Sequence, residues 1–274
     1  MQPINAYRIT PDGSLPLTIQ ATTFDELTHQ LPQGFYTTFR TYDGGKRVLG
    51  LKAHLERLYK PATLLKINPA VSVETLRHQA AQILDNYPDE ARVRLVMTKD
   101  GDIYIALTAL IPLPPEIYQY GVKVITTDVQ RESPRLKLTA FIGASESTRA
   151  QIARSEIFEA LLVRKNTILE GMTSNFFYVK DKIIGTAQNH ILLGVTRRTV
   201  LRVIRGSGFD IVYRPLKREQ VAALSEAFLT SSSRGIVPII QIDDTSVGEG
   251  SPGPITKKLM DGYKLYVKQH AEII

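Results

Sequence analysis

The run Ile111–Glu116 constrains the fold of this chain more than any other, because it contains three prolines in four positions. Proline has no backbone N–H for a β-ladder, so the run is expected to form a stiff connector. It divides the 274 residues into a smaller α/β domain, residues 1–111, a linker, residues 112–116, and a larger domain, residues 117–274. A cleft between two such domains is the default position for a functional site.

Both halves mix strand and helix patterns, which predicts an α/β (α+β) fold. Runs of aromatic and β-branched residues separated by turn residues predict strands, and apolar residues at helical spacing after capping residues predict helices. Strands are expected near 35–42, 47–49, 91–98, 103–107, 121–127, 176–179, 183–186, 209–213 and 226–230. Helices are expected near 23–27, 51–65, 72–84, 145–154, 192–204 and 217–224, and from about 254.

Composition and charge argue against several classes of protein. The chain has no cysteine, which excludes a disulfide scaffold and thiolate chemistry. Its net charge of +7 is spread among acidic residues, so no nucleic-acid partner is expected. The most apolar run, Ile103–Leu113, is too short to span a bilayer, and Met1–Arg8 lacks the pattern of a secretory signal. We therefore expect a cytoplasmic enzyme without a membrane partner.

Metal and serine chemistry also lack the usual sequence signals. The five histidines form no pair with metal-ligand spacing, and no G-x-S-x-G motif is present. We therefore expect no metal site, and the chemistry points to an organic cofactor.

The octet Glu170–Phe177 places a carboxylate, a glycine, small hydroxyl residues and an asparagine between two apolar runs, 166–169 and 176–179. A charged residue at the end of a buried strand is costly unless it is paired, and a protonated ring nitrogen would be a suitable partner. An ordinary polar hairpin turn is the alternative interpretation. The first is favoured by Lys137 upstream and by the run 192–197 downstream, where the start of a helix offers N–H groups to an anion.

In this order along the chain, these residues and the run His54–Leu58 resemble the class IV (fold type IV) pyridoxal-phosphate aminotransferases. That family includes branched-chain and D-amino-acid aminotransferases and aminodeoxychorismate lyase. The resemblance extends from about Gly34 to Pro238. It implies a two-domain fold type IV enzyme with its site in the cleft, pyridoxal 5'-phosphate as cofactor, small amino acids and 2-oxo acids as partners, and a homodimer.

The resemblance also assigns roles to particular residues. Lys137, 33 residues before Glu170, matches the lysine that holds the cofactor as a Schiff base and moves the α-proton. Glu170 would keep the pyridine nitrogen protonated, and Arg57 would reach the phosphate. Further cofactor-binding residues would be Thr173, Ser174, Asn175, Leu192, Val195, Thr196, Ser231 and Ser232. The substrate side would contain Tyr36, Arg40, Arg94 and Ser233.

Several of these residues also have an ordinary structural interpretation. A lysine between two leucines, like Lys137, is typical of an amphipathic surface position, and Arg94 could be a solvated strand residue. Residues 140–142 are Ala-Phe-Ile where many family members carry Asn and Tyr, and Thr37 stands where many carry Glu. Two other functions therefore stay open: a lyase that releases pyruvate and 4-aminobenzoate from aminodeoxychorismate, and a non-catalytic protein that keeps the fold.

Overall fold

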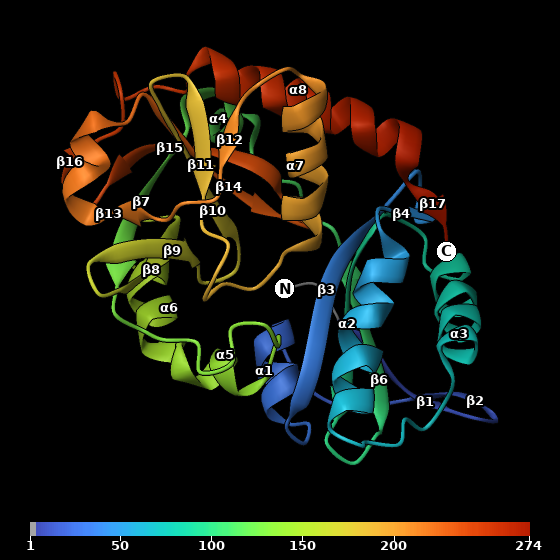
Figure 1. The fold of residues 1–274 in the computed structure, drawn as a ribbon. Coiled ribbons are helices and arrows are strands. Elements are labelled where there is room, and N and C mark those ends of the chain that lie inside the picture. The colour runs from blue at the N-terminus through green and yellow to red at the C-terminus, as the bar shows by residue number, and fades with distance from the viewer. Residues whose placement is uncertain (1–3) are drawn as a thin grey trace. The chain divides into compact units, whose positions relative to one another are not determined.

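The computed structural model describes residues 4–274, and contacts divide this part of the chain into two compact units. Residues 1–3 lie outside the described range. They are the first residues of Met1–Arg8, the stretch in which no secretory signal is expected. The first unit contains the described residues up to Ile111, together with Leu136–Gly143 and His270–Ile274. The second contains Pro112–Arg135 and Ala144–Gln269. Figure 1 shows the order of the elements along the chain.

The chain returns to the first unit twice after the proline-rich run. Leu136–Gly143 groups with it because the Tyr36 N–H donates to the Lys137 carbonyl over 2.9 Å and the Thr139 N–H donates to the Gly34 carbonyl over 3.0 Å. His270–Ile274 groups with it because the last strand pairs with residues 47–48. The domain boundaries expected from the sequence stay a prediction, and these two segments are where the contact units depart from them.

A seven-stranded antiparallel sheet forms the centre of the first unit. Its strands are β1 (Asn5–Thr10), β2 (Gly13–Pro16), β3 (Gly34–Tyr42), β4 (Arg47–Val48), β5 (Ala91–Thr98), β6 (Ile103–Ala109) and β17 (Glu272–Ile273). They are arranged in the order β17–β4–β3–β5–β6–β1–β2. The unit also contains α1 (Phe24–His29), α2 (Leu51–Leu64) and α3 (Val73–Asp85).

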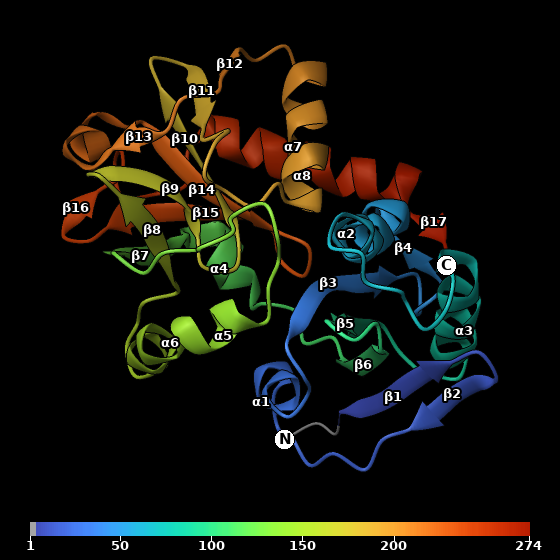
Figure 2. The ribbon, with the colours of Figure 1, turned by 60° about the horizontal axis from the view of Figure 1, so that its bottom comes forward.

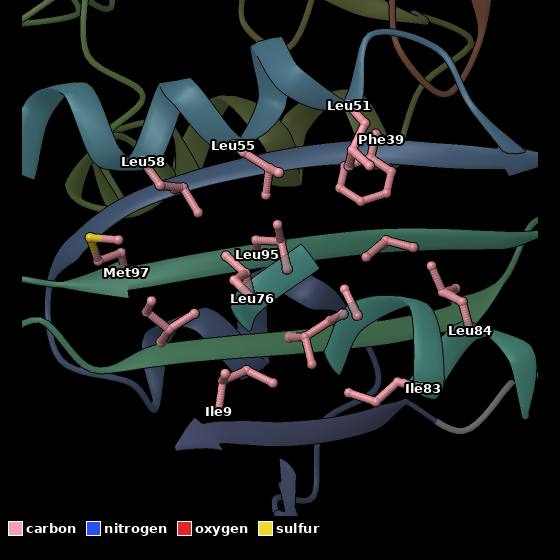
Figure 3. Close-up of a cluster of buried hydrophobic side chains, with 14 of the residues drawn as sticks. Ile9, Phe39, Leu51, Leu55, Leu58, Leu76, Ile83, Leu84, Leu95 and Met97 are labelled. Atoms are coloured by element: carbon pink, nitrogen blue, oxygen red, sulfur yellow. The ribbon is translucent and has the colours of Figure 1, made fainter. Parts of the chain in front are cut away.

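The core of the first unit lies between its sheet and two of these helices. Leu51, Leu55 and Leu58 recur at helical spacing on α2 and are all buried. Figure 3 shows them pointing toward Phe39 of β3 and Leu95 of β5, while side chains of α3 complete the same cluster. The apolar stripe of α2 therefore fixes the helix on the sheet, and it leaves the opposite helix face for polar residues.

The second unit is built on a ten-stranded sheet. Its strands are β7 (Val122–Thr127), β8 (Glu159–Arg164), β9 (Thr167–Gly171), β10 (Asn175–Lys180), β11 (Ile183–Thr186), β12 (Ile211–Val212), β13 (Leu216–Lys217), β14 (Glu226–Ser231), β15 (Gly235–Ile242) and β16 (Thr245–Ser246). The order is β12–β11–β10–β14–β15–β7–β8–β9–β13, with β16 on β15. A further pairing, of Glu170 in β9 with Asn175 in β10, closes the path from β10 through β14, β15, β7, β8 and β9 on itself.

Five helices accompany this sheet. They are α4 (Pro115–Tyr120), α6 (Glu146–Ala153), α7 (Val195–Gly206), α8 (Pro254–His270) and the 3₁₀ helix η1 (Arg218–Ala223). The short α5 (Ala140–Ala144) lies where the chain passes from the first unit to the second. Figure 2 shows α7 beside α8, where Arg202 donates to the Tyr266 hydroxyl over 3.3 Å. An ideal Cβ on Gly262 would lie 2.8 Å from Val203, so the two helices approach closely at a glycine.

Most predicted elements are present, and the differences have local causes. Thr23 and Ser72 cap α1 and α3, each accepting from a backbone N–H three residues later. Strands β1, β2, β8, β13, β15, β16 and β17 were not predicted. The proline-rich run is only partly a connector, since α4 begins at Pro115, a position where proline costs no helical hydrogen bond. The helix expected over 217–224 is a 3₁₀ helix preceded by a strand residue pair.

Among residues 4–274, no helix combines the length and the apolar character needed to cross a membrane.

Candidate active site

Glu170 is buried near the end of β9 and has donors on both carboxylate oxygens. Its Oε1 accepts from Arg131 Nε over 3.2 Å. Its Oε2 accepts from Asn175 Nδ2 over 3.2 Å and from the Leu192 N–H over 3.0 Å. A cation and two further donors stabilise the ionised carboxylate, which would otherwise be costly at 2% exposure.

The start of α7 lies beside this carboxylate. The Asn175 amide that donates to Glu170 also donates to the Leu192 carbonyl over 2.7 Å. Gly194 is the N-cap of α7, and a Cβ at this position would clash with Asn175 Oδ1. The glycine therefore lets the helix start pack directly on Asn175. Glu170, Asn175 and the residues that open α7 form one connected group.

The first turn of α7 presents groups that can bind an anion. Gly194 makes no side-chain cap bond, and the first turn contains no acidic residue. Its N–H groups and the helix dipole favour a negative ligand. The Thr196 hydroxyl donates to Ser232 Oγ over 3.2 Å, so a second hydroxyl from the end of β14 lies beside this turn.

Arg197 anchors the same turn to the loop before it. One nitrogen of its buried guanidinium donates to the Ala187 carbonyl and to Gln188 Oε1, each over 2.8 Å. Burial lowers the pKa of the Arg197 guanidinium from its ordinary value, although an arginine stays charged at any physiological pH. Its role is to hold the first turn of α7 in place.

The turn after Glu170 is built around a second buried acid, Glu159 at the start of β8. Glu159 Oε1 accepts from the Thr173 N–H over 2.6 Å, from the Thr173 hydroxyl over 3.0 Å and from the Ser174 hydroxyl over 3.1 Å. A Cβ on Gly171 would lie 2.6 Å from that same oxygen, so this position also requires glycine. In this structure the hydroxyls of Thr173 and Ser174 are engaged by Glu159.

The Ser231–Gly235 loop, which joins β14 to β15, is tied to the same acid. Arg234 Nη2 donates to Glu159 Oε2 over 3.0 Å and to Thr173 Oγ1 over 2.6 Å. Arg234 Nε donates to Ser231 Oγ over 3.0 Å. The guanidinium therefore joins this loop to the turn after Glu170.

Lys137 lies in the first unit, together with Tyr36. The Tyr36 N–H donates to the Lys137 carbonyl, and Leu138 bridges to Phe35 of β3. These contacts make residues 137–138 an extension of the sheet. The Lys137 Nζ lies 4.9 Å from the centroid of the Tyr36 ring, so the predicted nucleophile and the predicted substrate residue are neighbours.

The predicted arginines of the first unit differ in their surroundings. Arg94 is 4% exposed, and its Nη1 donates to Asp25 Oδ1 and the Phe24 carbonyl, each over 2.8 Å, and to Thr28 Oγ1 over 2.9 Å. Arg40 pairs with Glu90 and lies over the Tyr42 ring. Arg57 lies on α2 and is half-buried. Arg94 thus holds α1 to the sheet, whatever else it contacts.

The structure therefore brings the predicted residues together in two groups. Arg57, Lys137, Tyr36, Arg40 and Arg94 belong to the first unit, and the others belong to the second. Within the second unit, Glu170, Asn175, Leu192, Val195, Thr196 and Ser232 are connected as described. The assignment of these residues to a single site stays a prediction.

Sequence reasoning missed Arg131, Glu159 and Arg234. Each is a charged residue whose partner is far away in sequence: 39 residues for Arg131 and Glu170, and 75 for Arg234 and Glu159. No local pattern identifies such pairs. One local signal was Glu159 itself, a glutamate directly before the apolar residues 160–163 of its strand, where a buried acid requires a partner.

Comparison with known proteins identifies the family. A family model described as amino-transferase class IV matches residues 34–242. The chain is 27% identical over 265 residues to the D-alanine aminotransferase of Bacillus licheniformis, covering 87% of this chain and 89% of that protein. It is 26% identical over 277 residues to the branched-chain-amino-acid aminotransferase of Pseudomonas aeruginosa, covering 92% and 90%.

A solved structure shows the same fold. The T.th. branched-chain amino acid aminotransferase with pyridoxamine 5'-phosphate has a TM-score of 0.82 at 20% identity, covering 97% of this chain and 94% of that chain.

The chain belongs to the class IV aminotransferase family, because the family model matches most of its length. It is an enzyme with an aminotransferase function, and the expected family, fold class and enzyme class are thereby confirmed. The names of these relatives favour amino transfer over the lyase and over a non-catalytic protein.

Proposed function

We propose that this aminotransferase uses pyridoxal 5'-phosphate to move an amino group between an amino acid or amine and a 2-oxo acid. The observation that carries this proposal is the buried Glu170 carboxylate, connected through Asn175 to the start of α7. An acid beside an anion-binding helix end suits a ligand with a cationic ring nitrogen and a phosphate. The pyridoxamine 5'-phosphate in the solved T.th. enzyme supports the same cofactor class.

The phosphate would be held at the first turn of α7. The backbone N–H groups of Val195 and Thr196 would donate to its oxygens, and the hydroxyls of Thr196 and Ser232, 3.2 Å apart, could both contact it. Arg57 would add a planar, permanently charged donor from the first unit. Thr173, Ser174 and Ser231 would act as the polar frame around these contacts.

The ring nitrogen would be held by Glu170. Its Oε1 accepts from Arg131, and its Oε2 accepts from Asn175 and Leu192. An ionised carboxylate at this position keeps a proton on the ring nitrogen. When bound and protonated, the cofactor supplies an electron-withdrawing ring that accepts the electrons released at the substrate carbon.

Lys137 would act as the nucleophile and the base. Its Nζ would hold the cofactor at the aldehyde group, and the same amine would move the substrate's α-proton. The neighbouring Tyr36 ring limits where the lysine chain can lie. Tyr36, Arg40, Arg94 and Ser233 would line the substrate side, and Ser233 follows Ser232 in the loop after β14.

Substitution of Lys137 by alanine tests the central assignment. The purified protein, incubated with pyridoxal 5'-phosphate, should develop visible absorbance. Borohydride reduction should attach the cofactor covalently to Lys137 as a label, which mass spectrometry locates. Lys137→Ala should lose the absorbance, the label and all turnover. Lys99→Ala, at an exposed turn of the first unit, should retain all three. Turnover by Lys137→Ala, or a label on another lysine, would refute the proposal.

The amino donor and the assembly state complete the proposal. The amino donor can be identified by titrating L-amino acids, D-amino acids and simple amines in turn. The compound that abolishes the visible absorbance of the protein with bound cofactor is the donor. We expect a homodimer in solution, measurable by sedimentation velocity, and a cytoplasmic location. If only D-amino acids react, the specificity matches that of the D-alanine aminotransferases. If only branched L-amino acids react, it matches that of the branched-chain aminotransferases.

A further inference from the structure

The Glu159–Arg234 pair connects two segments that both carry predicted cofactor-binding residues. Glu159 is 3% exposed, and Arg234 retains 23% exposure of its side chain. The carboxylate accepts three hydrogen bonds on Oε1 from Thr173 and Ser174, and one on Oε2 from Arg234. All of these residues lie in the second unit. The acid therefore has a fully assembled set of donors within one compact unit.

The loop that Arg234 holds is short and has a defined geometry. Ser231 pairs with Gly235 across the β14–β15 hairpin, which leaves three residues in the loop. Gly235 has a φ of +68°, the left-handed conformation that commonly ends a three-residue hairpin loop. Arg234 Nε also donates to the Ser231 hydroxyl, so both ends of the loop are fixed. Fixing Arg234 and Ser231 leaves Ser232 little freedom.

Ser232 is the residue through which this arrangement reaches the helix end. Its Oγ accepts from the Thr196 hydroxyl in the first turn of α7. A displacement of the loop would move Ser232 away from Thr196 without touching Glu170, whose partners are Arg131, Asn175 and Leu192. The pair is thus placed to act on the phosphate end of a bound cofactor.

We propose that Glu159 and Arg234 are positioning residues that fix the Ser231–Gly235 loop against the Thr173–Ser174 turn, and thereby set how tightly Ser232 and Thr196 hold the cofactor phosphate. This inference rests on the proposed function, because it requires a phosphate-bearing cofactor at the start of α7. It concerns binding of one chemical group, the phosphate, and leaves the ring and the amine chemistry to other residues.

The test compares pyridoxal 5'-phosphate with pyridoxal, which lacks the phosphate, by titrating each into cofactor-free protein and measuring its Kd. Arg234→Met should weaken pyridoxal 5'-phosphate binding about tenfold, the loss expected when the phosphate loses one hydrogen bond, that of Ser232, and should leave the Kd for pyridoxal within about twofold. Arg234→Lys keeps the charge, so its Kd for pyridoxal 5'-phosphate should lie between that of the wild type and that of Arg234→Met. At saturating cofactor, kcat should change by less than about threefold, because the pair does not touch the reacting atoms.

Two controls separate this role from general loss of structure. Arg218→Met removes the arginine of another pair in the same unit, Arg218–Asp243 at 3.3 Å, and should change neither Kd. The double variant Glu159→Gln/Arg234→Met removes both charges together, so it avoids a buried unpaired acid and should fold while still showing the selective loss. Equal weakening of both ligands, or no change in either, overturns the inference. A wild-type protein that binds neither ligand overturns the proposed function itself.

Discussion

The surroundings of Arg94 predict a large loss of stability when this residue is replaced by methionine. The guanidinium is almost fully buried, and a single nitrogen, Nη1, donates to Asp25, to the Phe24 carbonyl and to Thr28. Its carbon also lies 4.7 Å from the Tyr36 ring centroid. Arg94→Met removes all of these contacts at once, and with them the link between α1 and the sheet.

The magnitude follows from the exposure of the partners. Breaking a fully buried ion pair costs about 3–5 kcal/mol, but Asp25 is 32% exposed on its side chain and can be solvated after the change. Methionine replaces part of the lost apolar contact. We therefore expect the free energy of unfolding to fall by about 2–3 kcal/mol, which lowers the urea midpoint by roughly 1 M for a slope near 2–3 kcal/mol per M.

Urea unfolding followed by circular dichroism measures this loss, and Arg92→Met is the matched control. Arg92 lies two residues earlier on the same strand and is exposed, with its guanidinium 5.3 Å from the Phe24 ring centroid, so its replacement should cost no more than about 1 kcal/mol. Asp25→Asn should cost about 1–2 kcal/mol, because Arg94 keeps its other acceptors. Equal urea midpoints for Arg94→Met and Arg92→Met would contradict the structural role of Arg94. Substrate binding would then be the remaining role proposed for this residue.

Two further substitutions test the second unit. Gly194→Ala keeps an allowed backbone conformation, but its Cβ would clash with Asn175. We therefore expect the free energy of unfolding to fall by about 1–3 kcal/mol and cofactor binding to weaken. An unchanged cofactor Kd would contradict the packing of Gly194 on Asn175. Burial raises the pKa of the Tyr178 hydroxyl above its ordinary value of 10.0, outweighing the opposite effect of Arg214. The folded state therefore holds this proton more tightly, and stability should fall as the pH rises above about 10, where the unfolded chain ionises first. Tyr178→Phe should flatten this alkaline loss above about pH 10, and an unchanged pH dependence of stability would contradict the assignment.

Local features of the fold were predictable because their causes are local. The Ser72 cap and the leucine stripe of α2 each depend on residues within a few positions of one another. A further local feature that the sequence carries is the β8–β9 turn, where Lys165 and Asn166 both have positive φ, at 48° and 59°. Two consecutive residues of positive φ suit the strand twist of a tight hairpin, and asparagine tolerates this conformation well.

The contacts that determine the candidate site were not predictable in this way. The Leu136–Gly143 segment joins the first unit because the Tyr36 N–H donates to the Lys137 carbonyl, a bond between residues that are far apart in sequence. The Arg234–Glu159 pair likewise depends on the register of four strands. A sequence pattern shows that a charged residue at a strand end needs a partner, but only the sheet topology selects which one.

The sheet topology also determines the position of Glu170, the acid to which we assign the cofactor's ring nitrogen. Glu170 and Asn175 are direct partners across the β9–β10 pairing that closes the strand path, so the position of the carboxylate is set by backbone pairing before any ligand binds. Asn175 then packs on Gly194, which sets the start of α7 relative to the acid. A ligand that contacts both the carboxylate and the helix end meets donors and acceptors whose positions are already fixed, so little ordering entropy opposes its binding. This pre-organisation depends on a glycine and an asparagine, Gly194 and Asn175, to which no chemical step is assigned.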